Sequence, residues 1–319
     1  MNIKIIIKFL FSFSFGERIG VWGLFIILMT SCSQKAYLFT SFHEPADAGL
    51  RMLYSFDAYH WKDFDTVFLK PQMGNQKVMR DPSMVQAPDG TFHLVWTSSW
   101  RGDKGFGYAS TKDFFHWTQQ KLVDVMAHEP TTVNVWAPEL FYDDVAKDYK
   151  IIWASTIPGR FERGIEEDSN NHRMYITSTK DFNEFSPIKL FIDPKFSVID
   201  AVIVKPNAND YVLVLKDNTR PERNLKVAYS NSPEGPWNKV SRPFSDNFTE
   251  GPTVVKIKDR WVIYFDSYRK KTYEAVATKD FINFENINNQ VSIPEGHKHG
   301  TIVPVKKKVI KDLLKKLGQ

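Results

Sequence analysis

The chain has 319 residues, of which 42% are hydrophobic and 14% aromatic, so it can bury a large core in one or two domains. Its formal net charge of +5 comes from residues 306–319, which hold six lysines and one aspartate. The rest of the chain is neutral and carries no basic stripe with interleaved aromatic residues, which excludes a typical nucleic-acid binder.

The first 32 residues are typical of a targeting segment, because Lys4 and Lys8 lead into apolar sequence. A second apolar run, residues 21–29, is too short to span a bilayer core of about 30 Å. Residues 28–32, Leu-Met-Thr-Ser-Cys, resemble a bacterial lipobox. This resemblance implies that Cys32, the only cysteine, is a lipid anchor at the periplasmic or outer face of the bacterial cell envelope. An ordinary transmembrane helix and a cleaved secretory signal are the alternatives.

One short pattern recurs five times along the remaining chain. An apolar strand ends in a small or hydroxyl residue, a turn with an aspartate and an aromatic residue usually follows, and a second aromatic residue closes the unit. The copies span residues 54–61, 109–117, 177–185, 229–237 and 277–284. Their spacing of about 50 residues is that of a propeller blade of four strands. Because aspartate accepts backbone N–H groups in tight turns, we interpret the pattern as architectural.

Between the copies the sequence reads as short strands, such as residues 91–97 and 149–154, and no long amphipathic helix competes with them. We therefore predict an all-β fold, a five-bladed β-propeller over residues 36–305. Residues 298–304 resemble an innermost strand without its own blade. They would join two N-terminal strands, at residues 37–42 and 50–54, so that both ends of the chain close the ring. Residues 306–319 are expected to form a short basic amphipathic helix or a frayed tail, and we favour a solvated basic tail over membrane binding.

The innermost strands of a propeller line its central channel, so polar residues at their starts are candidates for chemistry. The five starts are residues 80–82 (RDP), 136–139 (WAPE), 198–201 (VIDA), 249–252 (TEGP) and 299–301 (HGT). Four of them carry a carboxylate and the fifth carries His299. Because the blades are related by rotation, we expect Asp81, Glu139, Asp200 and Glu250 to occupy equivalent positions and to converge on the axis.

This set of motifs, in this order and spacing, resembles the family 43 glycoside hydrolases, which are five-bladed propellers acting on arabinose-, xylose- and sometimes galactose-containing glycans. The resemblance covers about residues 36–305. It implies that Asp81 is the general base, Glu250 the general acid, and Asp200 the carboxylate that tunes and positions the acid. It gives Glu139 no catalytic role. His299 matches a channel histidine that often stands beside a bound calcium ion, so no cofactor is required but a structural calcium ion is one expectation.

General chemistry is consistent with these roles. An inverting glycosidase needs one protonated and one ionised carboxyl group about 6.5–9.5 Å apart, with room for a water molecule. A third carboxylate near Glu250 would raise its pKa, which helps it hold a proton. Arg80 is adjacent to Asp81 on a strand and would point to the other face, which favours a structural role for it.

Sugar sites also need aromatic platforms and hydrogen-bond donors. The loop candidates for substrate binding are Trp100, Arg101, Trp136, Phe196, Arg220 and Arg223. The polar insertion at residues 157–172 would wall off one side of a pocket, which favours exo attack. Residues 43–45 mimic a strand start and are interpreted as a loop near the site.

We therefore predict an inverting, exo-acting hydrolase that releases arabinofuranose or xylose, or else galactose, from plant-type oligo- or polysaccharides. The protein is expected to be a monomer that meets the membrane only through its lipid anchor. One alternative is a carbohydrate-binding propeller without turnover, since the fold alone does not establish catalysis. The other is a related five-bladed fructoside hydrolase, which would need an Asn-Asp-Pro motif and a Glu-Cys pair that the sequence lacks.

Overall fold

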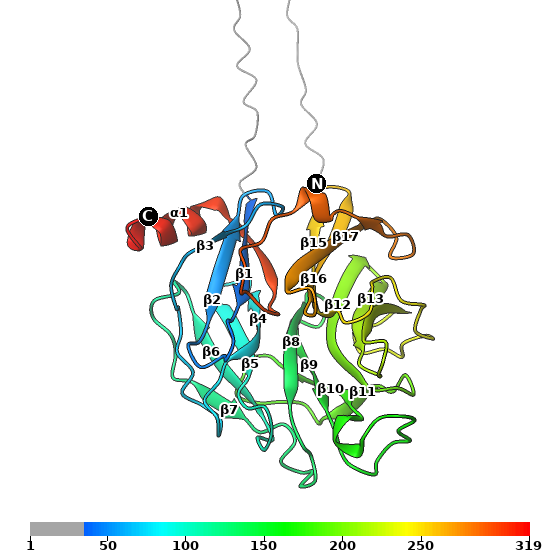
Figure 1. Cartoon of the computed structure of the whole chain (residues 1–319). Helices are drawn as coiled ribbons and strands as arrows, with labels where there is room; N and C mark the ends of the chain where they lie inside the picture. The colour runs from blue at the N-terminus through cyan, green and yellow to red at the C-terminus, as the bar shows by residue number, and fades with distance from the viewer. Residues whose placement is uncertain (1–34) are drawn as a thin grey trace, which may run out of the picture. The chain divides into compact units, whose positions relative to one another are not determined.

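The computed structural model describes residues 35–319, so the predicted targeting segment and Cys32 lie outside the described residues. The strands form five separate antiparallel sheets, arranged as the blades of a five-bladed β-propeller (Figure 1). The prediction of an all-β propeller is confirmed. In Figure 1 the inner strands β4, β8, β12 and β15 lie around the middle of the ring, and the outer strands β7 and β11 lie at its rim.

The first four blades follow one another along the chain, from the inner strand outward. The first contains β4 (Arg80–Gln86), β5 (Phe92–Thr97), β6 (Phe106–Thr111) and β7 (Lys121–Val123). The second contains β8 (Trp136–Asp143), β9 (Asp148–Ser155), β10 (Arg173–Thr179) and β11 (Lys189–Ile192). The third contains β12 (Val198–Asn207), β13 (Asp210–Asp217) and β14 (Asn224–Ser230). The fourth contains β15 (Glu250–Ile257), β16 (Arg260–Ser267), β17 (Thr272–Thr278) and β18 (Glu285–Asn286). Two short 3-10 helices, η1 (Asp168–Asn170) and η2 (Asn288–Gln290), lie in the connections.

The fifth blade combines both ends of the described chain, as the sequence predicts. Its inner strand is the C-terminal β19 (Ile302–Lys306), and β1 (Lys35–Ser41), β2 (Arg51–Ser55) and β3 (Lys62–Asp63) follow outward. Residues Phe39 and Ile302 are paired across the junction of the two ends. This pairing covers the sheet edges that an open ring would expose.

Apolar side chains from adjacent blades pack together at every junction of the ring. Five clusters of buried residues result, one for each pair of neighbouring blades. Trp96, between the fifth and first blades, and Trp153, between the first and second, are fully buried. Because each blade buries both faces only when its neighbours are present, closure of the ring completes the core.

The recurring aspartate turns are architectural, as predicted. In the first blade Asp113 Oδ1 accepts hydrogen bonds from the backbone N–H groups of Phe115 and His116, at 3.0 and 2.8 Å. The Thr111 hydroxyl accepts the N–H of Phe114, whose ring is buried between blades. Equivalent bonds recur at Asp57, Asp181 and Asp280. The fourth copy, which has Pro-Glu-Gly-Pro in place of the aspartate, lacks this turn.

Of the two forms predicted for the C-terminal residues, the structure shows the amphipathic helix, docked on the propeller rather than free as a solvated tail. They form a helix, α1 (Lys307–Lys316), that packs on the cluster between the fifth and first blades. Ile310 and Leu313 are buried, whereas the lysines of the helix lie on its other side. The spacing of these two residues gives the helix an apolar stripe opposite most of its lysines. Among residues 35–319, no helix has the length and apolar character needed to cross a membrane.

The docked helix makes a prediction for stability. Replacing Ile310 by valine removes one buried methylene group, so we expect the free energy of unfolding to fall by about 1 kcal/mol. Lys311→Ala is the matched control on the exposed side of α1, and it should change stability little. Denaturant unfolding of both variants measures the difference. Equal stability of wild type and Ile310→Val would show that the helix does not contribute to the folded core.

Candidate active site

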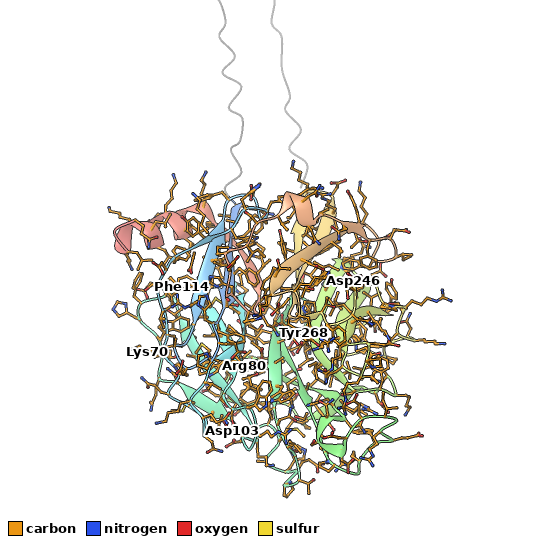
Figure 2. The ribbon with its side chains drawn as sticks, in the orientation of Figure 1. Lys70, Arg80, Asp103, Phe114, Asp246 and Tyr268 are labelled. Atoms are coloured by element: carbon orange, nitrogen blue, oxygen red, sulfur yellow. The ribbon has the colours of Figure 1, made fainter. Side chains whose placement is uncertain are left out.

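A cavity of about 290 Å³ lies where the inner strands begin, around the channel of the propeller. Its lining brings together residues from the starts of four inner strands, the ends of neighbouring strands and the segment before β19. These residues are Arg80, Asp81, Thr97, Trp100, Arg101, Trp136, Asn170, Ile199, Asp200, Lys216, Asn218, Arg223, Glu250 and His299. A larger hollow of about 520 Å³ between α1 and the first blade contains none of them. Figure 2 labels Arg80, from this cavity, near the middle of the ring and Phe114 toward its rim.

Each inner strand of the first four blades starts with a β-bulge. The register shifts between Arg80 and Ser83, and again at the same place in β8, β12 and β15. One residue of each bulge has a left-handed backbone, namely Asp81, Ala137, Asp200 and Gly251, with φ between 44° and 58°. A bulge interrupts the strict alternation of faces, so adjacent residues can both reach the channel.

The expectation of four equivalent carboxylates is therefore wrong. Asp81 and Asp200 occupy the left-handed position of the bulge, but Glu250 stands one residue earlier, in the place that Arg80 has in the first blade. The same bulge lets Arg80 line the cavity beside Asp81, which a regular strand would not allow. Glu250 and Asp81 reach one cavity from different strand positions because the bulge directs neighbouring side chains to the same side.

Asp81 is held by a hydroxyl group and an imidazole. Thr97 donates its hydroxyl to Asp81 Oδ2 at 2.8 Å, and His299 Nδ1 lies 3.4 Å from Asp81 Oδ1. Burial raises the pKa of Asp81, but the hydrogen bond and charge of His299 and the charge of Arg80 outweigh it and bring the pKa below its ordinary value. Asp81 is therefore ionised at neutral pH.

His299 is buried beside Asp81 and its pKa responds to the carboxylates of the channel. Burial lowers the pKa of His299, but the hydrogen bond to Asp81 and the charge of Asp200 together raise it to about 9. Among residues 35–319, the one cluster of three metal-ligating groups does not include His299. The structural calcium ion in the channel stays a prediction.

Asp200 and Glu250 share a buried lysine as their counter-ion. Lys216 Nζ donates to Glu250 Oε2 at 2.7 Å, and the backbone N–H of Gly251 donates to Asp200 Oδ2 at 3.1 Å. Burial raises the pKa of Glu250, but the charge and hydrogen bond of Lys216 bring it below its ordinary value. Burial and the charges of Glu250 and Asp81 leave the pKa of Asp200 raised. The expected rise in the pKa of Glu250 is thus absent in the free protein, and Asp200 shows it instead.

Lys216 was missed by sequence reasoning. It sits at the end of β13, in the apolar run Tyr-Val-Leu-Val-Leu-Lys-Asp, and its side chain is only 3% exposed. A lysine near the end of an otherwise apolar strand was the available signal. It indicates a buried charge with an acidic partner, since lysine is almost never fully buried without one.

Glu139 lies outside the cavity lining. Burial, partly offset by bonds from Ser83 and Thr301, raises its pKa to about 7. It accepts a hydrogen bond from Thr301 Oγ1 at 3.1 Å, which ties the second blade to the closing segment. This strongly perturbed carboxyl group is therefore best explained as a structural contact between blades.

An aromatic wall stands beside the carboxylates. The Trp100 and Trp136 rings are 4.8 Å apart, and Trp136 stacks in turn on His172 at 4.8 Å. The Arg80 guanidinium lies 4.5 Å from the centre of the Trp100 ring and binds both carboxylate oxygens of Glu44, at 2.7 and 2.9 Å. Residues 43–45 are therefore a loop at the site, as predicted. Trp100 remains 46% exposed, so its ring is accessible to a ligand.

The structure brings four of the six loop candidates to the cavity: Trp100, Arg101, Trp136 and Arg223. Phe196 is instead packed beside the cluster between the second and third blades, with Lys226 Nζ 5.0 Å from its ring. Arg220 pairs with Glu166 and Glu167 of the insertion, at 3.5 and 3.8 Å. Both lie outside the cavity lining because these contacts hold their side chains elsewhere.

The insertion at residues 157–172 contributes one wall of the cavity through Asn170. Glu166, only 3% exposed, accepts hydrogen bonds from the Asn170 amide and the Arg220 backbone N–H. Burial of Glu166 raises its pKa, but these bonds and the charge of Arg220 bring it below its ordinary value. The insertion is thus held against the third blade by polar contacts.

Comparison with known proteins identifies the family. A family model of glycosyl hydrolases related to family 43, described as "Probable glycosyl hydrolase domain", matches residues 33–310. No curated protein sequence matched the chain.

Solved structures share the fold at low sequence identity. An endo-1,4-β-xylanase from Bacteroides thetaiotaomicron has a TM-score of 0.58 and 14% identity over 84% of this chain and 94% of its own. A family 43 β-1,3-galactosidase solved with galactodeoxynojirimycin has a TM-score of 0.58 and 14% identity over 82% and 93%. An α-L-arabinofuranosidase from Lactobacillus brevis has a TM-score of 0.50 and 16% identity over 66% and 72%. With the family model matched over most of its length, the chain belongs to the family 43-related glycosyl hydrolases and is a glycosidase.

Proposed function

We propose that the protein is an inverting, exo-acting glycosidase in which Asp81 activates water, Glu250 protonates the leaving oxygen and Asp200 positions and tunes Glu250. The observation that carries this assignment is the meeting of exactly these three carboxylates in one cavity lined by aromatic and cationic side chains. A glycosidase of this type needs one ionised and one protonated carboxyl group. The environment of Asp81 lowers its pKa, whereas that of the Asp200–Glu250 pair raises the pKa of Asp200.

Asp81 suits the role of general base because it is ionised and oriented. His299 and Thr97 fix one oxygen each, and the positive charges of His299 and Arg80 keep the carboxylate deprotonated. A base must accept a proton from water during the reaction, and a hydrogen-bonded carboxylate keeps the lone pairs needed for that.

The acid requires one proton on the Asp200–Glu250 pair. In the free protein the charge and hydrogen bond of Lys216 lower the pKa of Glu250, whereas burial and the charges of Glu250 and Asp81 raise the pKa of Asp200. A bound sugar replaces water around the pair, which favours the neutral form of Glu250. Asp200 then acts through its negative charge, which disfavours ionisation of Glu250 and so raises the pKa of Glu250.

The ion pair predicts a pH effect. Lys216→Gln removes the cation that lowers the pKa of Glu250, so this pKa rises. Because Glu250 must be protonated to act, activity is lost as pH rises through its pKa, and the alkaline limb of kcat/KM should move to higher pH. Lys205→Gln is the matched control, since Lys205 pairs with Asp144 away from the cavity. An alkaline limb that stays in place or moves to lower pH would contradict the assignment of the acid.

We propose arabinofuranose or xylose as the released sugar, with galactose next, from plant-type glycans. The cavity of about 290 Å³ suits a single sugar ring, and the insertion and the Trp100 wall close two of its sides. Arabinofuranosidases, a xylanase and galactosidases all occur among proteins of the same fold. Walls on these sides leave less room for a chain to continue past the site, which favours attack on chain ends over attack within a chain.

The experiment measures release of aryl alcohol from arabinofuranosides, xylosides, galactosides and fructosides by the purified full chain. Turnover of one pentoside or galactoside class supports the proposal and identifies the sugar. Turnover of fructosides alone would support the related fructoside hydrolases. Retention of polysaccharide on an affinity gel without any turnover would favour a binding propeller.

We also propose that Cys32 carries a lipid and holds a monomeric propeller at the bacterial cell envelope. The support is the lipobox-like string at residues 28–32. Cys32→Ala should abolish metabolic labelling with palmitate and release the protein from the membrane fraction.

A further inference from the structure

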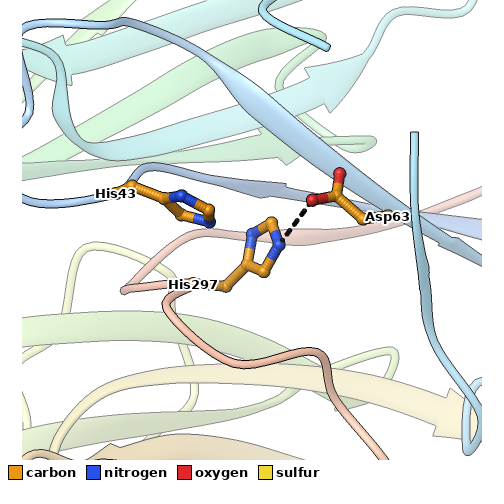
Figure 3. Close-up of side chains that lie close together, drawn as sticks. All are labelled: His43, Asp63 and His297. Atoms are coloured by element: carbon orange, nitrogen blue, oxygen red, sulfur yellow. Dashed lines mark hydrogen bonds and ion pairs between the residues drawn. The ribbon is translucent and has the colours of Figure 1, made fainter. Parts of the chain in front are cut away.

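A second cluster of chemically active side chains lies in the fifth blade, outside the cavity lining. His43 follows β1, Asp63 ends β3, and His297 lies in the segment that leads from β18 to β19 (Figure 3). One potential ligand atom from each of the three lies within 4.8 Å of the others. His297 comes from the opposite end of the described chain, so the three residues meet only when the ring is closed.

His297 is firmly held in this cluster. Its side chain is fully buried, its Nδ1 atom lies 3.0 Å from Ser41 Oγ, and its Nε2 atom lies 3.0 Å from Asp63 Oδ2. Ser41 in turn donates its hydroxyl to the Lys298 carbonyl at 3.1 Å, so the His297 Nδ1–H donates to Ser41. The Nε2 lone pair of His297 then faces the carboxylate of Asp63, and the two acceptor atoms need a cation or a proton between them.

His43 completes the set. Its ring meets that of His297 edge to face, with centroids 4.4 Å apart and an interplanar angle of 74°. His43 Nε2 is buried and has no hydrogen-bond partner, which costs free energy in an otherwise satisfied region. Figure 3 shows the His297 ring between the His43 ring and Asp63, with a contact drawn only between His297 and Asp63. The His43 ring is therefore positioned beside the other two groups with an unused nitrogen.

We propose that His43, Asp63 and His297 form a binding site for a transition-metal ion of the Zn²⁺ type. Two imidazoles and a carboxylate are common zinc ligands, and zinc–ligand bonds of about 2.0–2.2 Å place neighbouring ligand atoms about 3.3 Å apart in a tetrahedron. The 3.0 Å separation of His297 Nε2 and Asp63 Oδ2 is close to that value. The bond from His297 Nδ1 to Ser41 is the outer contact that orients a metal-binding histidine.

The metal would hold the two ends of the closed ring together. It joins the loop after β1, the outer strand β3 and the C-terminal closing segment, which otherwise associate through strand pairing and packing. The proposed metal site is also close to the active site in the chain. Glu44, which follows His43, binds Arg80, and His299, two residues after His297, contacts Asp81. Arg51 at the start of β2 acts electrostatically on both His43 and Asp63, and its positive charge disfavours binding of a cation.

The experiment uses the purified full chain, stripped of metal with a chelating resin and titrated with ZnCl₂. We expect one Zn²⁺ per chain by calorimetry and by elemental analysis after dialysis, and a Tm that rises by about 5 °C at a hundredfold excess over Kd. Co²⁺ loaded in place of Zn²⁺ should give the visible absorption of a tetrahedral site.

Two variants separate this site from adventitious binding. His43→Gln removes one ligand but leaves the His297–Asp63 contact intact, so it should abolish stoichiometric binding with little change in the Tm of the metal-free protein. His116→Gln is the matched control, because His116 also contacts an aspartate, Asp113, but is exposed and belongs to no cluster of three metal-ligating groups among residues 35–319. If wild type and His43→Gln bind Zn²⁺ equally, or if Zn²⁺ leaves the wild-type Tm unchanged, the proposal is overturned.

Discussion

Replacing Glu250 by alanine is expected to lower kcat/KM by about 10²–10⁴ on substrates with poor leaving groups, because the leaving oxygen then departs without a proton. The loss should nearly vanish on a dinitrophenyl glycoside, whose phenolate leaves without protonation. Only a general acid produces this dependence on the leaving group. Measuring kcat/KM across a series of aryl glycosides therefore distinguishes the proposed role of Glu250 from a role in folding or in sugar binding.

Asp81→Asn provides the matching test of the base. The substitution keeps the size of the side chain and its bond to Thr97 but removes the negative charge. Activity should fall by about 10²–10⁴ with every leaving group, since activation of water does not depend on the departing alcohol. Glu285→Ala in the outer strand β18, where Glu285 is exposed, is the control and should retain full activity. An Asp81→Asn variant with wild-type turnover would exclude Asp81 as the base.

The fold was predictable because one strand-and-turn pattern recurs along the sequence at the spacing of the blades. The aspartate turns recur with the blades, since each needs an acceptor for two backbone N–H groups at the same point. The closing of the ring by both termini followed from counting strands: one blade lacked an inner strand, and residues 298–304 lacked a blade. These are local features, and local patterns can be recognised in a sequence without knowledge of tertiary contacts.

The details of the site depend on geometry that the pattern does not contain. The bulges shift Glu250 relative to Asp81 and bring Arg80 into the cavity, and a bulge has no reliable sequence signature. The pKa of Glu250 depends on Lys216, which lies on a different blade and 34 positions away in the chain. The orientation of loop side chains such as Phe196 and Arg220 is likewise fixed by partners distant in sequence.

Gly300→Ala is expected to have the largest effect on stability. A Cβ atom at Gly300 would lie 1.8 Å from the backbone oxygen of Thr40, which cannot move away as a flexible side chain could. Thr40 and Thr301 also bond each other at this point, through the Thr301 N–H at 2.8 Å and the Thr40 N–H at 3.1 Å. The substitution therefore pushes the closing segment away from β1, and we expect the free energy of unfolding to fall by about 3 kcal/mol or more.

Gly159→Ala separates this steric effect from the general cost of replacing a glycine. Gly159 has a φ of 74° but open space where its Cβ would lie, so only backbone strain of about 1–2 kcal/mol applies. Guanidinium unfolding of both variants gives the comparison, and Gly300→Ala should also lose activity because the neighbouring His299 contacts Asp81. Equal losses in the two variants would mean that the closing segment tolerates displacement. A selective loss in Gly300→Ala would instead identify the junction of the chain ends as the point where stability of the ring and geometry of the site depend on the same contact.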